Sequence, residues 1–229
     1  MWLMTHLPRA LLARRLGLAD RLRFPAASLL SDAKRATLDL LDLNGALHVP
    51  EGDGVFPVEH LTVFDVDAFD PELLDELRSA LTGPPVSTGE WLLISRERCH
   101  YRRLVDEAAL LEAFPKLRAV RLEECSLEEQ IRLLSGADVV VGAHGAGFAN
   151  LLFCGPGTHV VEIQDPEDPN PHFYMLAAVL GLRYQRLVAG VDPREAPHFR
   201  DLHLGCEALE EAIRRLEAVG VRGGEVLAG

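Results

Sequence analysis

Apolar and polar residues alternate regularly along the second part of the chain. Short apolar runs predict strands at residues 91–94, 119–122, 139–141, 158–163 and 183–188. Amphipathic stretches predict helices at residues 101–114, 126–135, 172–180 and 206–218, and a short helix after a glycine loop near residue 147. Strands that alternate with helices indicate right-handed βαβ units. The pattern therefore predicts an α/β fold with a doubly wound, Rossmann-type parallel sheet.

The first 85 residues follow a less regular pattern. Residues 3–16 predict a helix that Pro8 interrupts early, and residues 31–43 predict another with Ser31 or Asp32 as its N-cap. Two short apolar runs, residues 46–49 and 61–64, predict strands. We therefore expect a small α/β unit at the N-terminus.

A clear helix start and a turn-rich linker mark the end of that unit. Asp70 is an N-cap residue followed by Pro71 at the first helical position, and leucines recur behind it at helical spacing. Residues 82–89 are rich in glycine, proline, serine and threonine, so they end the helix. We expect two domains, residues 1–85 and residues 86–229.

The loop after the strand at residues 139–141 is the most informative stretch of the chain. It carries three glycines in the order G-x-x-G-x-G: Gly142, Gly145 and Gly147. Glycine lets the backbone approach a ligand closely and adopt positive φ angles. A strand, a glycine loop and a helix N-terminus together present N–H groups to an anion, which predicts a nucleotide-type ligand. The glycine order departs from the dinucleotide fingerprint G-x-G-x-x-G, and tight packing of the loop is the alternative.

The composition fits a soluble globular protein. Apolar residues make up 48% and charged residues 25% of the 229 positions. No apolar run approaches the ~20 residues that a membrane-spanning helix needs. Residues 1–18 contain scattered arginines and predict an amphipathic helix rather than a signal peptide. The four cysteines are widely spaced, which predicts reduced thiols in a cytoplasmic protein.

The charge balance narrows the choice of partners. The formal net charge of -12 argues against nucleic acid, because nucleic-acid binding depends on clustered lysine and arginine. One local cluster runs against this acidity: Arg96, Arg98, Arg102 and Arg103. Arg96 and Arg103 can clamp a diphosphate through paired hydrogen bonds. Their spacing relative to Glu107 suits salt bridges on a helix surface equally well.

Three polar residues around the glycine loop are further candidates. His144 can hydrogen-bond a phosphate or a sugar hydroxyl, or it can fix the loop by bonding backbone. Asn150 can cap the following helix or bond the loop carbonyls, and contact with a ligand is the alternative. Glu162 ends a strand between buried aliphatic residues, so its carboxylate needs a partner. It can accept from both hydroxyls of a ribose, or it can be a solvated acid at the strand end.

Four motifs in one order resemble glycosyltransferase family 61. They are Ile94-Ser95-Arg96 with Arg102-Arg103-Leu104 and Glu107, then Ser126-Leu-Glu-Glu-Gln130-Ile131, then the glycine loop through Phe153, then Pro156-Gly157 through Glu162-Ile163. The resemblance covers residues 91–189. A thinner match, Trp2-Leu3 with Leu7-Pro8-Arg9, extends it toward the N-terminus.

The resemblance implies a two-lobed, GT-B-like fold in which the C-terminal lobe holds a nucleotide sugar, usually a UDP-sugar. It implies inverting chemistry without a metal or cofactor; Asp65 and Asp67 form a D-x-D triplet, but in the other lobe. Arg96 and Arg103 would face the diphosphate, and Glu162 would bind the ribose. The full implied donor-binding set is Ser95, Arg96, Arg103, Gly142, His144, Gly145, Ala146, Gly147, Asn150 and Glu162.

The chain departs from the family pattern at several positions. Met1 stands where members commonly have histidine, Asp106 where they often have asparagine, and Phe148-Ala149 where they have Leu-Thr. The N-terminal lobe, at about 85 residues, is also short for the family. An inverting transferase needs a general base. The candidates are His6, for which a partly buried helix histidine is the alternative, and His144.

Three functions are compatible with these residues. The first is a glycosyltransferase that moves a sugar to a glycan acceptor in the biosynthesis of a capsular or other surface polysaccharide. It would act in the cytoplasm, and peripheral association with the inner membrane and a homodimer are both compatible with the sequence. The second is a truncated, non-catalytic nucleotide-sugar-binding module that works with a partner chain. The third is an NAD-dependent oxidoreductase.

Overall fold

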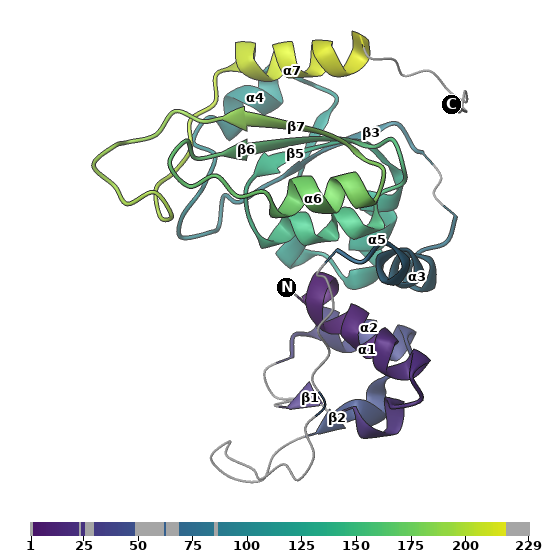
Figure 1. Cartoon of the computed structure of the whole chain (residues 1–229). Coiled ribbons are helices and arrows are strands. Elements are labelled where there is room, and N and C mark those ends of the chain that lie inside the picture. Colours follow the sequence, from purple (N-terminus) through teal and green to yellow (C-terminus); the bar gives the residue numbers. More distant parts are fainter. Residues whose placement is uncertain are drawn as a thin grey trace.

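A five-stranded parallel sheet forms the centre of the molecule (Figure 1). The computed structural model describes residues 2–22, 24–25, 30–48, 62, 69–84 and 87–218. The strands lie in the order β4-β3-β5-β6-β7. Their bounds are β3 Glu90–Ile94, β4 Leu117–Val120, β5 Ala137–Ala143, β6 His159–Gln164 and β7 Arg183–Val188. The predicted α/β fold with a Rossmann-like parallel sheet is confirmed.

Helices cover both faces of this sheet (Figure 1). On one face lie α4 (Glu107–Ala113) and α7 (Cys206–Ala218); on the other lie α5 (Leu127–Gly136), α6 (His172–Val179) and the 3₁₀ helix η6 (Ala146–Phe153). Side chains alternate along each strand, so Val141 and Val161 belong to one apolar cluster, whereas Val140 and Val160 belong to the other. The sheet is thus the middle layer of three.

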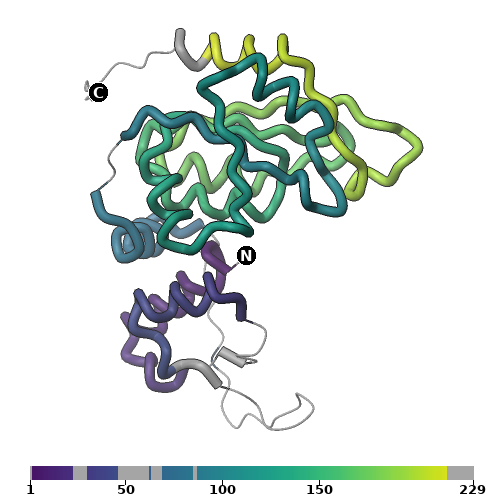
Figure 2. The backbone as a smooth tube through the Cα atoms, turned by 180° about the vertical axis from the view of Figure 1, so that it is seen from behind, coloured from purple at the N-terminus to yellow at the C-terminus, as the bar shows by residue number. Residues whose placement is uncertain are grey.

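The N-terminal helices stand apart from the sheet but share its core (Figure 2). They are the π-helical turn η1 (Trp2–His6), α1 (Leu7–Arg15), the short η2 (Ala19–Arg21), α2 (Asp32–Leu40), η4 (Asn44–Ala46) and α3 (Pro71–Leu81). A two-residue parallel pair, β1 (Phe24–Pro25) and β2 (Leu47–His48), accompanies them. As predicted, Ser31 caps α2 by accepting from the Lys34 N–H, and Asp70 caps α3 by accepting from the Leu73 N–H.

One apolar cluster connects these helices to the sheet. It contains Leu7 of α1 and Leu74 of α3 together with Phe148 and Leu152 of η6. The described N-terminal residues form helices and a single short strand pair. The GT-B organisation and the boundary between residues 85 and 86 therefore stay predictions.

Some predicted elements differ from the structure. The helix expected over residues 101–114 begins only at Glu107, because Arg102 adopts a φ of 55° and Leu104 forms a β-bridge with Leu202. The strand expected at residues 119–122 begins at Leu117, and its end becomes the 3₁₀ turn η5 (Leu122–Glu124). The strand expected at residues 61–64 lies outside the described residues except for Thr62. None of the described helices is long and apolar enough to cross a membrane.

Candidate functional site

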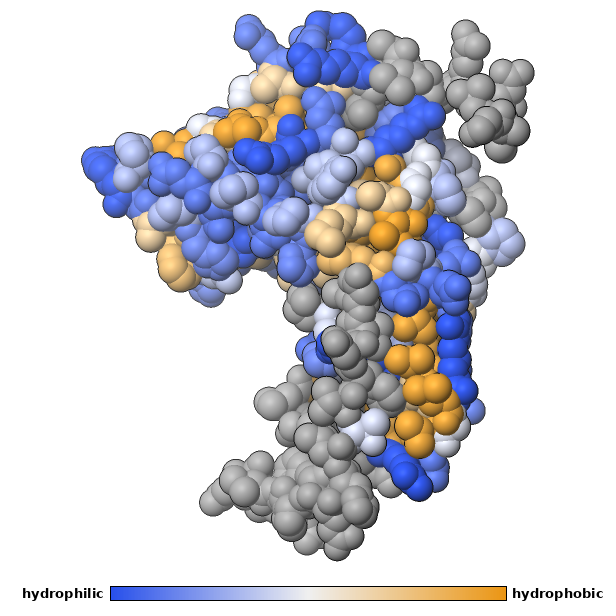
Figure 3. Space-filling model, in the orientation of Figure 1, coloured by the Kyte–Doolittle hydropathy of each residue, from blue (hydrophilic) through white to orange (hydrophobic). Residues whose placement is uncertain are grey.

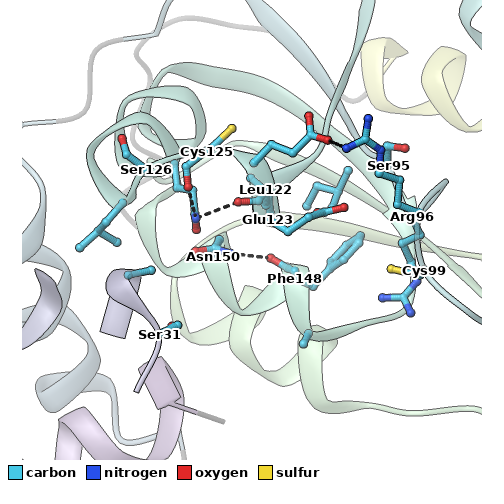
Figure 4. Close-up of a pocket in the computed structure, with 18 of the residues that line it drawn as sticks. Ser31, Ser95, Arg96, Cys99, Leu122, Glu123, Cys125, Ser126, Phe148 and Asn150 are labelled. Atoms are coloured by element: carbon cyan, nitrogen blue, oxygen red, sulfur yellow. Dashed lines mark hydrogen bonds and ion pairs between the residues drawn. The ribbon is translucent and has the colours of Figure 1, made fainter. Parts of the chain in front are cut away.

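A cavity of about 1110 Å³ lies at the carboxyl edge of the sheet. Its walls come from the segments that follow β3, β4 and β5, and from the start of α2. Figure 4 shows Ser31, which caps α2, on one side of the cavity and Arg96 and Cys99 on the other. Ligands of parallel α/β sheets bind outside the carboxyl ends of the strands. The position of the cavity therefore makes it the candidate ligand site.

The cavity gathers about half of the residues predicted for donor binding. Those that line it are Ser95, Arg96, Ala146, Gly147 and Asn150. The predicted site residues that do not line it are His6, Arg103, Gly142, His144, Gly145 and Glu162. His6 is exposed on η1, where its ring packs against Trp2 at 5.7 Å.

Arg96 is a positive charge in the cavity wall that is held in place by hydrogen bonds. Its Nε donates to the Arg102 carbonyl at 3.1 Å and its Nη2 to the Tyr101 carbonyl at 3.2 Å. The guanidinium also stacks on the Tyr101 ring, 5.8 Å from the centroid. Burial lowers the pKa of Arg96, but an arginine stays charged at neutral pH. Within the described ranges no carboxylate forms an ion pair with it, so its charge is available to an anion.

The other arginines of the cluster are directed elsewhere. Arg98 pairs with Glu124, and both side chains line the cavity. Arg103 is exposed, and its Nη2 and Nε both donate to Oδ2 of Asp201, at 2.6 and 3.0 Å, while its backbone N–H donates to Oδ1 at 2.9 Å. The alternative of an Arg103–Glu107 salt bridge is wrong, because Arg103 pairs with Asp201 instead. Burial raises the pKa of Glu107.

Close packing explains the three glycines of the loop. A Cβ on Gly142 would lie 2.9 Å from Cε2 of Phe148, and one on Gly147 would lie 3.0 Å from Cγ2 of Ile94. A Cβ on Gly145 would collide with the Arg96 guanidinium. Positive φ angles occur at other glycines of the described chain but at none of these three. The packing alternative therefore accounts for the glycines. At Gly145, the absence of a side chain leaves the space that the Arg96 guanidinium occupies.

Asn150 stabilises the same loop. Its Nδ2 donates to the Gly147 carbonyl at 3.1 Å, drawn as a dashed line in Figure 4. The predicted role of bonding a loop carbonyl is confirmed. Because the side chain also lines the cavity, contact with a ligand stays a prediction.

Beside the cavity, Glu162 is fully buried between two partners. Its Oε1 lies 2.5 Å from Nδ1 of His144, and its Oε2 accepts from the Tyr184 hydroxyl at 2.5 Å. The alternative of a solvated strand-end acid is therefore wrong. His144 is fixed by this carboxylate rather than by backbone acceptors. A ribose would have to displace one of the two partners to reach Glu162, so its role in ribose binding stays a prediction.

Tyr184 is the member of this group that sequence reasoning missed. Burial, and then its hydrogen bond to Glu162, raise the pKa of the phenol, so the hydroxyl remains a donor at any physiological pH. The sequence signal that could have led to Tyr184 is that a buried Glu162 requires a hydrogen-bond donor. Tyr184 lies on β7, the strand next to that of Glu162. Spacing along the chain gave no hint of the pair.

The described residues contain no group of three or more His, Cys, Asp or Glu side chains able to hold a metal ion. Residues 65–67, which carry the D-x-D letters, lie outside the described part of the chain. Independence from metal stays a prediction.

Comparison with known proteins gives one family match. The model of the family Glycosyltransferase 61 matches residues 2–161. A 66-residue segment is 36% identical to a beta-1,2-xylosyltransferase of Arabidopsis thaliana, covering 29% of this chain and 12% of the relative. Over 107 residues the chain is 33% identical to the EGF domain-specific O-linked N-acetylglucosamine transferase of Drosophila melanogaster, covering 44% of this chain and 20% of the relative.

A third relative has a similar degree of likeness. The protein O-linked-mannose beta-1,4-N-acetylglucosaminyltransferase 2 of Homo sapiens is 33% identical over 107 residues, which cover 44% of this chain and 18% of the relative. The matched segments thus span only 12–20% of the length of these three relatives.

Proposed function

The chain belongs to glycosyltransferase family 61, and from this premise we propose that it transfers a sugar from a nucleotide-sugar donor, a UDP-sugar, to a glycan acceptor. The reaction we propose is inverting and independent of metal, and it serves polysaccharide biosynthesis. The names of the three relatives specify xylose or N-acetylglucosamine as the sugar they transfer. UDP-xylose and UDP-N-acetylglucosamine are accordingly the first donors to test.

The single observation that supports this function best is the seat of Arg96. A charged guanidinium without an ion-pair partner among the described residues stands in a large cavity at the carboxyl edge of a Rossmann-like sheet. Two backbone carbonyls and the Tyr101 ring fix its orientation before any ligand arrives. A preorganised cation of this kind stabilises the charge that develops on a leaving diphosphate.

The chemistry of the proposed reaction assigns roles to few residues. The acceptor oxygen forms a bond to the anomeric carbon, while the bond from that carbon to the diphosphate oxygen breaks and its electron pair leaves with UDP. A general base takes the acceptor proton. We assign this role to His144, which a buried carboxylate orients and which directly follows Ala143 of the cavity wall, in preference to His6, an exposed residue of η1.

A second function, a nucleotide-sugar-binding module, is favoured by one observation. The matched segments correspond to a small part of each relative, so most of the length of those proteins has no counterpart in the alignment. Such a module would bind UDP through Arg96 as the enzyme does, but would not turn over a UDP-sugar. Donor hydrolysis or transfer therefore separates the two functions.

The test is a calorimetric titration of the purified chain with UDP, without added metal and with NAD as the control ligand. Wild type is expected to bind UDP and not NAD. Arg96→Gln is expected to lose at least tenfold in affinity, because a charge-assisted contact to phosphate contributes about 1.5–3 kcal/mol. The matched control is Arg118→Gln, which removes an exposed arginine paired with Glu90.

Arg103→Gln tests the second arginine implied by the family resemblance. Its pair with Asp201 leads us to expect little change in UDP affinity. Equal losses for the Arg96 and Arg118 variants, or saturable binding of NAD instead of UDP, would contradict the proposed function.

A further inference from the structure

We propose that Tyr184 is a positioning residue: acting through Glu162, it holds His144 in the tautomer that carries its hydrogen on Nδ1 and leaves Nε2 for the substrate. The catalytic meaning of this device rests on the proposed function. The hydrogen-bond arrangement itself stands on the geometry of three neighbouring strands.

The sheet brings the three side chains together. Glu162 on β6 is in register with Gly142 on β5, and Tyr184 on β7 is in register with Val160 on β6. His144 follows the end of β5, and its backbone N–H donates to the Ile163 carbonyl at 2.9 Å. Glu162 and Tyr184 lie on adjacent strands, and His144 directly follows the third strand and is held by its backbone bond to Ile163, so sheet hydrogen bonds set the relative positions of the three residues.

A chain of hydrogen bonds sets the direction of the Tyr184 hydroxyl. The Gln164 amide is oriented by Asn170, whose carbonyl accepts from Nε2 at 2.8 Å and whose N–H donates to Oε1 at 3.2 Å. Nε2 of Gln164 also donates to Oη of Tyr184 at 3.4 Å. The tyrosine oxygen is thus an acceptor toward Gln164, and its hydrogen is left to point at Oε2 of Glu162, 2.5 Å away.

The Glu162 carboxylate, whose Oε2 is occupied by the Tyr184 hydroxyl, in turn fixes the tautomer of His144. An ionised carboxylate only accepts hydrogen bonds, so the Nδ1 atom next to Oε1 must carry the hydrogen. The Phe173 ring lies 5.2 Å from the imidazole and limits its rotation. On the far side of the ring, Nε2 has no hydrogen-bond partner in the described part of the chain. In this arrangement Nδ1 carries the hydrogen that is bonded to Glu162, and Nε2 is able to accept a proton.

Tyr184 lies outside the four family-like motifs and beyond residue 161, where the match to the family model ends. The arrangement follows the logic in which a buried acid selects the tautomer of a catalytic histidine, with a phenol added to fix the acid.

The experiment is nitrogen-15 NMR of the imidazole groups in the whole, ligand-free protein, with His144→Gln used to assign the signal. Wild type is expected to show His144 with a slowly exchanging hydrogen on Nδ1. In Tyr184→Phe that hydrogen is expected to exchange about tenfold faster, because Glu162 loses one of its two fixed donors. The matched control is Tyr174→Phe: this exposed tyrosine touches the Tyr184 ring at 5.6 Å but forms no hydrogen bond within the described residues.

Glu162→Gln provides a second test with a directional outcome. In this variant the Tyr184 hydroxyl should donate to the amide oxygen, so that the amide NH₂ faces Nδ1 of His144. Nδ1 must then accept, and the imidazole hydrogen is expected on Nε2. A wild-type hydrogen on Nε2, or exchange in Tyr184→Phe equal to that in Tyr174→Phe, would overturn the inference. If the role of Tyr184 is purely structural, Tyr184→Phe will lower the melting temperature without changing the tautomer of His144 or the exchange rate of its Nδ1 hydrogen.

Failure of the proposed function gives a different result. If UDP does not bind but the Nδ1 signal responds as described, the positioning inference holds and the glycosyltransferase assignment falls. If UDP binds through Arg96 and the Nδ1 signal does not respond to Tyr184→Phe, the reverse is true.

Discussion

Two buried carboxylates at the carboxyl edge of the sheet are held by partners of different kinds. Glu162 is bound by an imidazole and a phenol. Asp165, just beyond the end of β6, is bound by the guanidinium of Arg200, with Nε at 2.5 Å and Nη2 at 2.6 Å. Both side chains of this second pair are almost fully buried. The pair fastens the segment before α7 to the loop after β6, next to the group that contains His144.

The Asp165–Arg200 pair predicts a pH dependence of stability. The Arg200 hydrogen bonds hold the pKa of Asp165 below its usual range. A lowered pKa in the folded state means that the contribution is complete above the unfolded-state value of about 3.9 and is lost as the pH falls through the folded value. The melting temperature of Asp165→Asn should therefore lie well below that of wild type at pH 7, and the gap should narrow below about pH 4.

The control for this prediction is Asp75→Asn on α3, whose exposed pair with Arg78 contributes little to stability. Its melting temperature should stay close to that of wild type throughout. A gap for Asp165→Asn that is constant from pH 7 to pH 3 would show that the charge of Asp165 is not what stabilises the fold.

At the residue scale, the sequence predicts which buried polar side chains require a hydrogen-bond partner, but it does not identify that partner. The burial of Glu162 between aliphatic residues follows from the strand pattern, and so does its need for a donor. The donor Tyr184 lies 22 positions further along, and the partner of Asp165 lies 35 positions away. The strand order of the sheet brings Tyr184 to Glu162, and the path of the segment before α7 brings Arg200 to Asp165; neither is contained in the local pattern.

At the scale of elements, the most accurate predictions concern helices whose first residue is fixed by capping side chains close by in the sequence. The N-terminus of α5 is the clearest example. Ser126 accepts from the Glu129 N–H at 3.2 Å, and the Glu129 carboxylate accepts from the Ser126 N–H at 2.9 Å. This reciprocal capping box satisfies two N–H groups that the helix itself leaves without partners. Because donor and acceptor are three residues apart, the sequence alone reveals the start of the helix.

The capping box gives a prediction for Ser126→Ala. The substitution is expected to lower the free energy of unfolding by about 1 kcal/mol, the usual cost of losing an N-cap side chain. Urea denaturation followed by circular dichroism measures the change. Glu128→Ala is the control, since Glu128 lies in the same first turn but outside the capping box. Losses of equal size in the two variants would mean that the first turn responds to lost charge rather than to the lost cap.

The helix expected over residues 101–114 shows where local chemistry is overridden. Its second half forms α4, but the first half is bound to a distant segment. Val105 donates to the Leu202 carbonyl, Leu202 donates to the Arg103 carbonyl, and the Asp106 carboxylate accepts from the Leu204 N–H. Residues 201–204 thus supply partners that a helix would otherwise supply within itself. An amphipathic pattern gives no information about competing hydrogen bonds from a distant segment of the chain.

At the scale of the whole molecule, the surface shows apolar residues over the N-terminal helices and beside the sheet (Figure 3). The large apolar side chains exposed among the described residues are Leu16, Leu40, Val105, Tyr174, Met175, Val188 and Phe199. They are distributed over both the N-terminal helices and the sheet region. The predicted homodimer and the predicted association with the inner membrane are therefore still predictions.

The shared core argues that the N-terminal helices and the sheet unfold together. The apolar cluster that contains Leu7 and Leu74 continues without a break into η6 and the α5–α6 face of the sheet. Separate domains would each enclose a core of their own. Here the helices bury their apolar faces against η6, so removing them would expose the cluster to water. A single cooperative transition follows, although the linker pattern predicts a boundary at residue 85.

The two tryptophans of the chain permit a direct test of this cooperativity. Trp2 lies on η1 and donates to the Thr37 hydroxyl of α2 at 2.8 Å, whereas Trp91 lies on β3 beside the opposite core. Trp91→Phe leaves a reporter in the N-terminal helices, and Trp2→Phe leaves one in the sheet. In urea, the fluorescence midpoint of each variant should coincide with its own circular dichroism midpoint. A Trp2 signal that is lost at lower urea than the circular dichroism signal of the same variant would establish two domains that unfold separately.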